Sequence, residues 1–344
     1  MNLIEVFLYG SSLRKLENIG SASREVEYYE SLAKSLNKCY IIDYSNVNKS
    51  KIKNTLIISK PSSFTNFHWS LFAGKHISKE IDFKRENIIV RSKQNLGAWT
   101  AYLIAKKFNA KFILRIGYSY SQSKQKESIY GFCLYPIFYF YEYVMVLLSD
   151  HVIVSSEYLA KKFFIKKSKY SLVRNSVDKR FLNPTQREIK YAWISVGRII
   201  PIKGSLKLSK FAIKRKDGLI VGKNPQKLNL GDNTYFERVD NVEIHQYFAS
   251  AKYYISLSET EGNPKTLMEA IFSGCIPILS SIPAHKDIIK ELGYGYLIES
   301  IEEIDVLIDS QKSNFNKACF DTFINRWCTK NVISKEIKLL REYI

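Results

Sequence analysis

Two glutamates in one short stretch carry the clearest chemical signal in the chain. Glu261 stands in a polar turn that follows a predicted strand over Tyr253–Leu257, and Glu269 comes eight residues later on a predicted helix. Between them, Gly262 and the first amides of the helix form a site that favours anions and sugar oxygens. Taken alone, these residues also fit an ordinary strand–helix–strand unit with two solvated glutamates.

Two basic residues follow another predicted strand. Tyr191–Val196 is apolar and ends in Gly197-Arg198, and Lys203 comes five residues after Arg198. Arginine can bind phosphate oxygens through two parallel hydrogen bonds, whereas lysine acts as a point charge. Gly197 allows the backbone to approach a ligand closely. We therefore interpret Arg198 and Lys203 as a clamp for phosphate groups.

The elements around both sites have the pattern of strand–helix–strand units. In the unit that carries the glutamates, Asn263 is placed to cap the helix, Pro264 suits its first position, and Gly274 is placed to end it. A buried strand over Cys275–Leu279 follows.

The N-terminal half shows the same alternation of strands and helices, which predicts a parallel sheet with helices on both faces. Loops after the strands of such a sheet face the ligand. Candidates for contact with an acceptor in these loops are Gly20, Arg24, Gly117 and Tyr118.

Three motifs together resemble one enzyme family. The stretch EGNPKTLME, with Glu261 and Glu269 in a Glu-x7-Glu pattern, resembles the donor-site signature of retaining glycosyltransferases of family four (glycosyltransferase group 1). Gly197–Gly204, a GRxxxxKG arrangement, resembles the family's diphosphate clamp. Asn175–Phe181 is similar to the family's inter-domain element Pro-Asn-Gly-Val-Asp-x-x-Phe, with Arg174 and Ser176 in place of the proline and the glycine.

The resemblance implies the GT-B fold, in which two Rossmann-like, doubly wound parallel-sheet domains face a cleft. We expect an acceptor-binding domain over residues 1–185 and a nucleotide-sugar-binding domain over residues 186–326. The terminal helix, residues 327–344, would cross back to the first domain.

The resemblance also implies roles for individual residues. Arg198 and Lys203 would stabilise the negative charge that develops on the leaving diphosphate, and Glu269 would accept hydrogen bonds from the ribose hydroxyls. Glu261 would hold the sugar hydroxyls or stabilise positive charge on the ring. The remaining donor-binding candidates are Gly197, Gly262, Asn263, Pro264, Lys265 and Thr266.

The expected donor is a UDP-sugar or GDP-sugar, and the expected outcome is retention of the anomeric configuration. The chain contains no Asp-x-Asp motif, and the two cations would replace a metal, so neither a metal nor a cofactor is expected. The family often has a histidine near the transferred sugar, whereas here the corresponding strand ends in Gly117-Tyr118-Ser119, and His68 and His76 lie elsewhere.

Composition bears on the partners and on the compartment. The chain has 52 Lys and Arg against 33 Asp and Glu, a net charge of +19, which favours anionic partners such as nucleotide phosphates, lipid headgroups or nucleic acid. Five scattered cysteines without a CxxC pair indicate reduced thiols in a cytoplasmic protein. The N-terminus is interpreted as a first strand, so no export is expected.

One segment suggests contact with a membrane. Residues 119–128 are polar and basic, which predicts a flexible loop, and the following Tyr130–Leu148 is apolar and aromatic but interrupted by Pro136 and Glu142. We interpret the second part as a buried helix. A basic segment followed by dense aromatic residues is also typical of peripheral contact with an anionic membrane or of a groove for a lipid acceptor.

Three readings of function remain at this point. The first is a retaining hexosyltransferase that extends a glycan or a polyprenyl-diphosphate-linked acceptor in bacterial surface polysaccharide synthesis, such as capsule or lipopolysaccharide, at the inner face of the cell membrane. The second is a non-catalytic GT-B partner subunit. The third is a basic nucleic-acid-binding protein, although no nucleic-acid-binding module is recognisable. Within enzymes, an epimerase or a phosphorylase is a further alternative.

Overall fold

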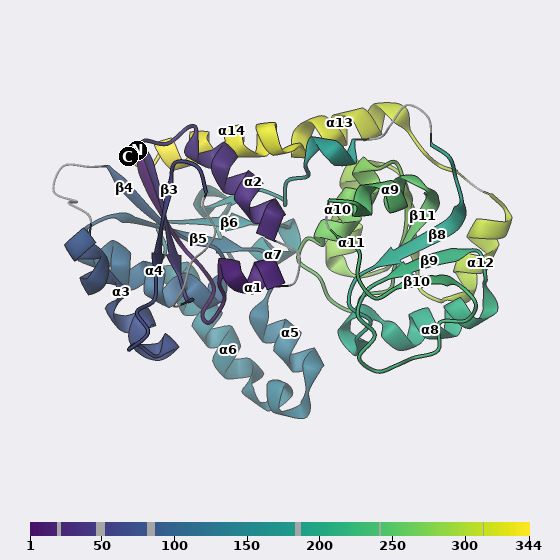
Figure 1. The fold of residues 1–344 in the computed structure, drawn as a ribbon, viewed down its shortest axis with the longest axis horizontal. Coiled ribbons are helices and arrows are strands. Elements are labelled where there is room, and N and C mark those ends of the chain that lie inside the picture. The colour runs from purple at the N-terminus through teal and green to yellow at the C-terminus, as the bar shows by residue number, and fades with distance from the viewer. Residues whose placement is uncertain (19–21, 46–51, 81–86, 183–186, 241, 312) are drawn as a thin grey trace. The chain divides into compact units, whose positions relative to one another are not determined.

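The computed structural model describes the chain except for residues 19–21, 46–51, 81–86, 183–186, 241 and 312. It divides into two compact units (Figure 1). Unit 1 comprises Met1–Gln125, Tyr130–Arg174 and Ile333–Ile344, and unit 2 comprises Lys126–Ile129 and Asn175–Val332. The boundary that the sequence placed between residues 185 and 186 lies outside the described residues.

The described part of unit 1 is built on a sheet of seven parallel strands. Their spatial order is β3 (Thr55–Ser59), β2 (Lys38–Asp43), β1 (Asn2–Val6), β4 (Ile88–Ser92), β5 (Lys111–Ile116), β6 (His151–Val154) and β7 (Tyr170–Leu172). Its helices are α1 (Leu13–Asn18), α2 (Ala22–Ala33), α3 (Asn66–Glu80), α4 (Ala98–Lys107), α5 (Tyr120–Glu127), α6 (Ile129–Leu148), α7 (Glu157–Lys162) and most of α14 (Thr329–Arg341).

Burial explains why the central strands form. Every residue of β1 and β6 is buried, as expected for parallel strands that helices cover on both faces. The core of unit 1 packs apolar side chains of the strands, such as Ile4 and Leu114, against Trp69 of α3 and Ile104 of α4.

The described part of unit 2 is built on a sheet of six parallel strands. Their spatial order is β10 (Thr234–Phe236), β9 (Gly218–Val221), β8 (Tyr191–Val196), β11 (Ala251–Ser256), β12 (Ile276–Ser280) and β13 (Tyr296–Ile298). Its helices are α8 (Ser205–Lys214), α9 (Ile244–Ala249), α10 (Lys265–Phe272), α11 (Pro283–Leu292), α12 (Glu302–Asp309) and α13 (Lys317–Trp327).

The strand order of unit 2 changes direction between β8 and β11. From β8 the chain continues through β9 to β10 on one side, and then returns to place β11 on the other side of β8. The connections that follow β8 and β11 therefore start at the same edge of the sheet but lead to strands on opposite sides, β9 and β12. In open α/β sheets, ligands bind at such a switch point, at the carboxyl ends of the strands.

Most of the C-terminal helix belongs to the first unit. Within unit 1, Glu336 of α14 is fully buried, and its carboxylate pairs with Arg91 of β4 at 3.4 Å and with Arg115 of β5. The Tyr28 hydroxyl of α2 donates a hydrogen bond to the same carboxylate, and Figure 1 shows α14 beside α2. The two arginines hold the pKa of Glu336 below its usual range although burial acts to raise it.

Two expectations about residues 119–148 are wrong. The segment predicted as a flexible loop contains the helix α5, whose first amides are bonded by Glu142: Tyr120 N lies 2.7 Å from Glu142 Oε1. The following helix, α6, was expected to be buried, yet many of its large apolar side chains are exposed. Sequence alone cannot distinguish a helix that the core covers from one that it leaves open.

Candidate active site

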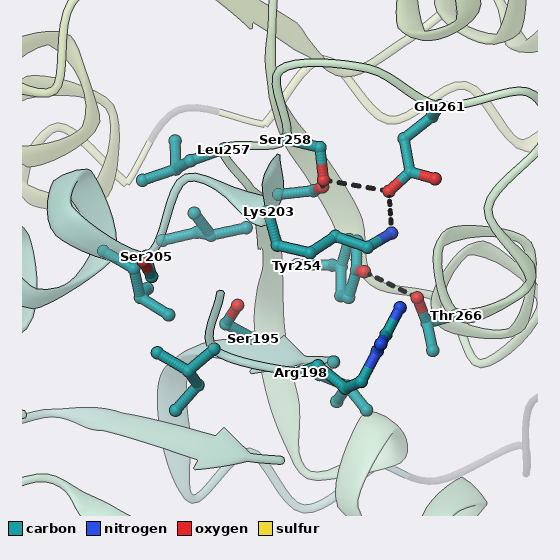
Figure 2. A pocket seen from close by; sticks show the side chains of 15 residues that line it. Ser195, Arg198, Lys203, Ser205, Tyr254, Leu257, Ser258, Glu261 and Thr266 are labelled. Atoms are coloured by element: carbon teal, nitrogen blue, oxygen red, sulfur yellow. Dashed lines mark hydrogen bonds and ion pairs between the residues drawn. The ribbon is translucent and has the colours of Figure 1, made fainter. Parts of the chain in front are cut away.

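The switch point of unit 2 brings the two sequence motifs together. Because β8 and β11 are adjacent and parallel, Gly197-Arg198 after β8 and the turn Ser258–Glu261 after β11 leave the same edge of the sheet. One pocket is lined by residues from both turns, including Gly197, Arg198, Lys203, Ser258, Glu261 and Thr266 (Figure 2).

An ion pair joins the two motifs. The Lys203 ammonium bonds the Glu261 carboxylate, and Ser258 Oγ donates a hydrogen bond of 2.9 Å to the same carboxylate oxygen (Figure 2). The Lys203 side chain retains 32% exposure and that of Glu261 12%. Lysine is therefore held beside the carboxylate while part of its ammonium group stays accessible to a ligand.

Arg198 is exposed and forms no ion pair within the described residues. In Figure 2 its guanidinium extends toward the side of the pocket that holds the Lys203 amine and Thr266. A guanidinium without a carboxylate partner is available to bind an anion through two hydrogen bonds. Among the described residues, the pocket thus holds the unpaired Arg198 and Lys203, which is paired with Glu261.

Two glycines make the close backbone approaches around the pocket possible. Gly204, which precedes α8, has φ +71°, and a Cβ there would lie 2.1 Å from the Leu257 carbonyl oxygen. Gly222 has φ +151°, and a Cβ there would lie 1.8 Å from the Gly197 carbonyl oxygen. A side chain at Gly204 would push the turn that carries Lys203 away from Leu257, and one at Gly222 would displace the turn that carries Arg198.

The start of α10 differs by one residue from the prediction. The helix begins at Lys265 with Pro264 as its N-cap, whereas Asn263 was expected as the cap. Asn263 is 6% exposed, and neither Oδ1 nor Nδ2 has a hydrogen-bond partner among the described residues. Its main-chain oxygen accepts a hydrogen bond of 2.6 Å from Asn175 Nδ2, which links the Asn175–Phe181 motif to this turn.

The remaining donor-site candidates lie around α10. Thr266 lines the pocket, and its hydroxyl lies 3.0 Å from that of the buried Tyr254 on β11. Glu269 lies one turn further along α10, is buried, and does not line this pocket. Gly262 is buried and Lys265 half-buried in the stretch that joins Glu261 to the helix.

His285 of α11 is a buried neighbour of the Lys203–Glu261 pair. Its Nδ1 lies 2.8 Å from the Ser280 carbonyl oxygen, and its Nε2 has no partner among the described residues. Burial lowers its pKa to about 4, so the imidazole is neutral at physiological pH.

The acceptor-side candidates belong to unit 1. Gly117 and Tyr118 follow β5 directly, at the carboxyl edge of that sheet, and Gly117 N donates a hydrogen bond of 2.7 Å to Gln94 Oε1 from the loop after β4. A Cβ at Gly117 would lie 2.3 Å from the Gln94 side chain. Gly20 lies outside the described residues, and for Arg24 only its place in α2 is described.

Sequence reasoning missed two residues that shape these sites. Ser258 donates a hydrogen bond to Glu261. The sequence feature that could have revealed it is its position in the same turn, three residues before that glutamate. Glu142 is fully buried in α6 and accepts hydrogen bonds from Asn95 Nδ2 at 2.5 Å and Ser121 Oγ at 2.5 Å. In the sequence, Glu142 was recognised only as a charge that interrupts the apolar run Tyr130–Leu148.

Comparisons of sequence and structure show which known proteins the chain is similar to. Residues 187–314 match the family model described as glycosyl transferases group 1. The chain is 26% identical to Protein CapJ of Staphylococcus aureus over 276 residues, which is 73% of this chain and 68% of CapJ.

Solved structures share the fold over the whole chain. The lipopolysaccharide outer core galactosyltransferase WaaB has a TM-score of 0.69 at 15% identity, with both chains fully covered. Anabaena Alr3699/HepE in complex with UDP has a TM-score of 0.73 at 10% identity, covering 99% of this chain and 100% of that one. The two sheets and these likenesses define the GT-B fold. Within that fold, residues 187–314 of unit 2 are similar to glycosyl transferases group 1.

Proposed function

We propose that the protein transfers a hexosyl group from a nucleotide-sugar donor with retention of anomeric configuration and without a metal. The observation that carries this proposal is the arrangement of Arg198, Lys203 and Glu261 in one pocket at the switch point of unit 2. A retaining transfer needs a stabilised diphosphate leaving group and a group that supports the reacting sugar, and these three side chains supply both.

The leaving group is stabilised by charge. As the bond between the sugar and the diphosphate breaks, negative charge grows on the diphosphate oxygens. Arg198 pairs with no carboxylate among the described residues, so its guanidinium is available to bind the diphosphate. Lys203 supplies the second positive charge from the same edge of the sheet. Removing one such contact in an active site typically lowers kcat by about 10²–10³-fold.

Glu261 supports the sugar. Ser258 and Lys203 fix its carboxylate, which therefore needs no rearrangement when the donor binds. The unpartnered carboxamide of Asn263 adds a donor and an acceptor for sugar hydroxyls. Thr266 lines the pocket on this side, and Gly262, Pro264 and Lys265 would contact the donor from the start of α10. Gly197 would allow close approach of the phosphates, and Glu269 would bind the ribose.

Similar proteins support a uridine donor. Structures of Alr3699/HepE are in complex with UDP and with UDP-glucose, so we propose a UDP-sugar before a GDP-sugar. We further propose that the acceptor is a glycan or a polyprenyl-diphosphate-linked glycan of a bacterial surface polysaccharide, bound by the loops of unit 1 that contain Gly117 and Tyr118. The protein would then work in the cytoplasm, peripherally at the inner face of the membrane.

Two measurements test this proposal. Product NMR should show the same anomeric configuration as the donor, and an inverted product would overturn the retaining mechanism. Turnover should be unchanged in EDTA, because Arg198 and Lys203 carry the charge that a metal would supply. Loss of turnover in EDTA that magnesium or manganese restores would contradict the metal-independent mechanism.

A further inference from the structure

The helix α6 presents an exposed apolar stripe along most of its length. Cys133, Ile137, Phe140 and Leu147 follow one another at spacings of four, three and seven residues, which places them on one face of a helix. Ile137 is 63% exposed, Phe140 66% and Leu147 58%. Phe132 and Leu134 widen the stripe at its N-terminal end. Soluble monomers rarely leave such a continuous apolar surface uncovered.

The opposite face of α6 attaches it to unit 1. Glu142, the only charged residue of the helix, lies on this face, is fully buried, and is bonded by Asn95, Ser119, Tyr120 and Ser121. Met145 and Val146 are buried in the core of unit 1. The exposed stripe therefore contains no charge, and its orientation is fixed by a rigid attachment on the other side.

A lysine-rich segment contacts α6 and reaches the stripe at Leu147. Residues 161–169 contain five lysines and no acidic residue. The Lys162 ammonium lies 5.6 Å from the centre of the Tyr135 ring and 5.8 Å from that of Tyr139, and Lys169 Nζ donates a hydrogen bond of 3.1 Å to the Leu147 carbonyl oxygen. Both ends of the segment thus contact α6. Phe164 is 79% exposed in the same segment.

We propose that this surface, the exposed stripe of α6 with the lysines of residues 161–169, docks on an anionic lipid bilayer. The aromatic and aliphatic side chains enter the boundary between headgroups and acyl chains, and the lysines contact the lipid phosphates. This proposal rests on the proposed function in one respect, because the proposed acceptor is attached to a membrane.

The helix lies in the plane of the membrane and does not cross it. By length and composition α6, with 20 residues and a mean hydropathy of 1.5, could span a bilayer. However, only two residues separate it from β6, which pairs with β5 and β7 inside the sheet of unit 1.

Charge favours a bilayer over a second copy of the chain. In a symmetric dimer through this stripe, the lysines of residues 161–169 would face those of the partner or lie close to them, and like charges disfavour that contact. An anionic bilayer satisfies the apolar stripe and the lysines together.

Flotation with lipid vesicles tests the proposal. The full chain is mixed with phosphatidylcholine vesicles that contain about 30% phosphatidylglycerol, a content chosen to give a strongly anionic surface. The double variant Ile137→Glu/Phe140→Glu should float at least tenfold less than the wild type. The control Leu206→Glu/Val306→Glu places the same charges at exposed apolar positions of unit 2, at 61% and 65% exposure, and should float like the wild type. Lys161→Ala/Lys166→Ala should release the protein at lower salt.

Other outcomes overturn the proposal. Equal flotation of Ile137→Glu/Phe140→Glu and its control would do so, as would absence of wild-type flotation. A concentration-dependent dimer without vesicles, abolished in the α6 variant, together with no flotation would assign the stripe to a second copy. Thermal stabilisation by UDP, measured on every variant, shows that each is folded, and it separates a failure of docking from a failure of the donor site.

Discussion

The ammonium of Lys203 bonds the carboxylate of Glu261, although the two residues lie 58 positions apart and follow different strands. The pair exists because β8 and β11 are neighbours at the point where the strand order of unit 2 changes direction. It places a positive charge for the leaving diphosphate next to a carboxylate for the sugar, which is the basis of the proposed mechanism.

Substitution Lys203→Ala should lower kcat by about 10²–10³-fold, because it removes a cation that acts on the charge developing in the transition state. Turnover of the donor under saturating conditions measures this effect. Lys207→Ala, an exposed lysine on α8, is the matched control and should keep wild-type turnover. A Lys203→Ala enzyme with kcat within about threefold of the wild type would exclude a catalytic role for this lysine.

Substitution Glu261→Gln keeps the size of the side chain and removes its charge. We expect kcat to fall by at least about 100-fold while the dissociation constant for the free nucleotide changes little, because Glu261 supports the sugar and not the diphosphate. Titration calorimetry with the nucleotide and turnover assays give the two quantities. Glu259→Gln, exposed in the same turn, is the control. Equal loss of nucleotide affinity and turnover would instead assign Glu261 to the nucleotide.

Substitution Glu336→Gln should destabilise the protein by about 3–5 kcal/mol, because Arg115 and Arg91 both lose a carboxylate and the remaining Glu5 balances only one of the two positive charges. The free energy of unfolding from urea titration measures the change. Glu342→Gln, at the exposed third-last residue of the chain, should alter stability by less than about 0.5 kcal/mol. Similar stability of the two variants would show that the buried network does not hold α14 to unit 1.

His285 should make stability depend on pH. Its pKa is lowered to about 4 in the folded protein, from an ordinary value of 6.5, so the unfolded chain binds a proton that the folded one does not. Its contribution is therefore fully present above about pH 6.5 and is lost as the pH falls toward about 4, by about 3 kcal/mol in total.

The variant His285→Gln isolates this contribution. The difference in unfolding free energy between wild type and variant should shrink between pH 7 and pH 5, since both chains share all other titrating groups. His245→Gln, at a half-buried histidine of α9, serves as the control for the loss of an imidazole elsewhere in unit 2. A constant difference between wild type and His285→Gln across this range would refute the assignment.

The sequence predicts the fold well where local patterns and burial agree. Apolar strands such as those around Ile4 and Ile278 alternate with helices, and this rhythm requires a parallel sheet in each half. The stretch that contains Glu261 and the Gly197–Gly204 motif was found for the same reason, since strand ends, glycines and charges coincide there.

Other features depend on contacts that no local pattern encodes. Glu142 looked like a charge interrupting an apolar run, but it binds the start of α5 and so converts an expected loop into a helix. The apolar face of α6 looked like a core face, and only the packing of Met145 and Val146 shows which side is covered. Asn263 looked like a helix cap, yet its carboxamide remains buried and unpartnered among the described residues.

The most direct test of the donor site is thermal stabilisation of wild type and Arg198→Ala by UDP, GDP, ADP and their sugars. Selective stabilisation by one nucleotide, lost in Arg198→Ala and kept in the control Arg326→Ala on α13, is the predicted result and names the base. If no nucleotide stabilises the wild type, the donor site is refuted, and the chain would be a non-catalytic GT-B partner subunit or a basic nucleic-acid-binding protein.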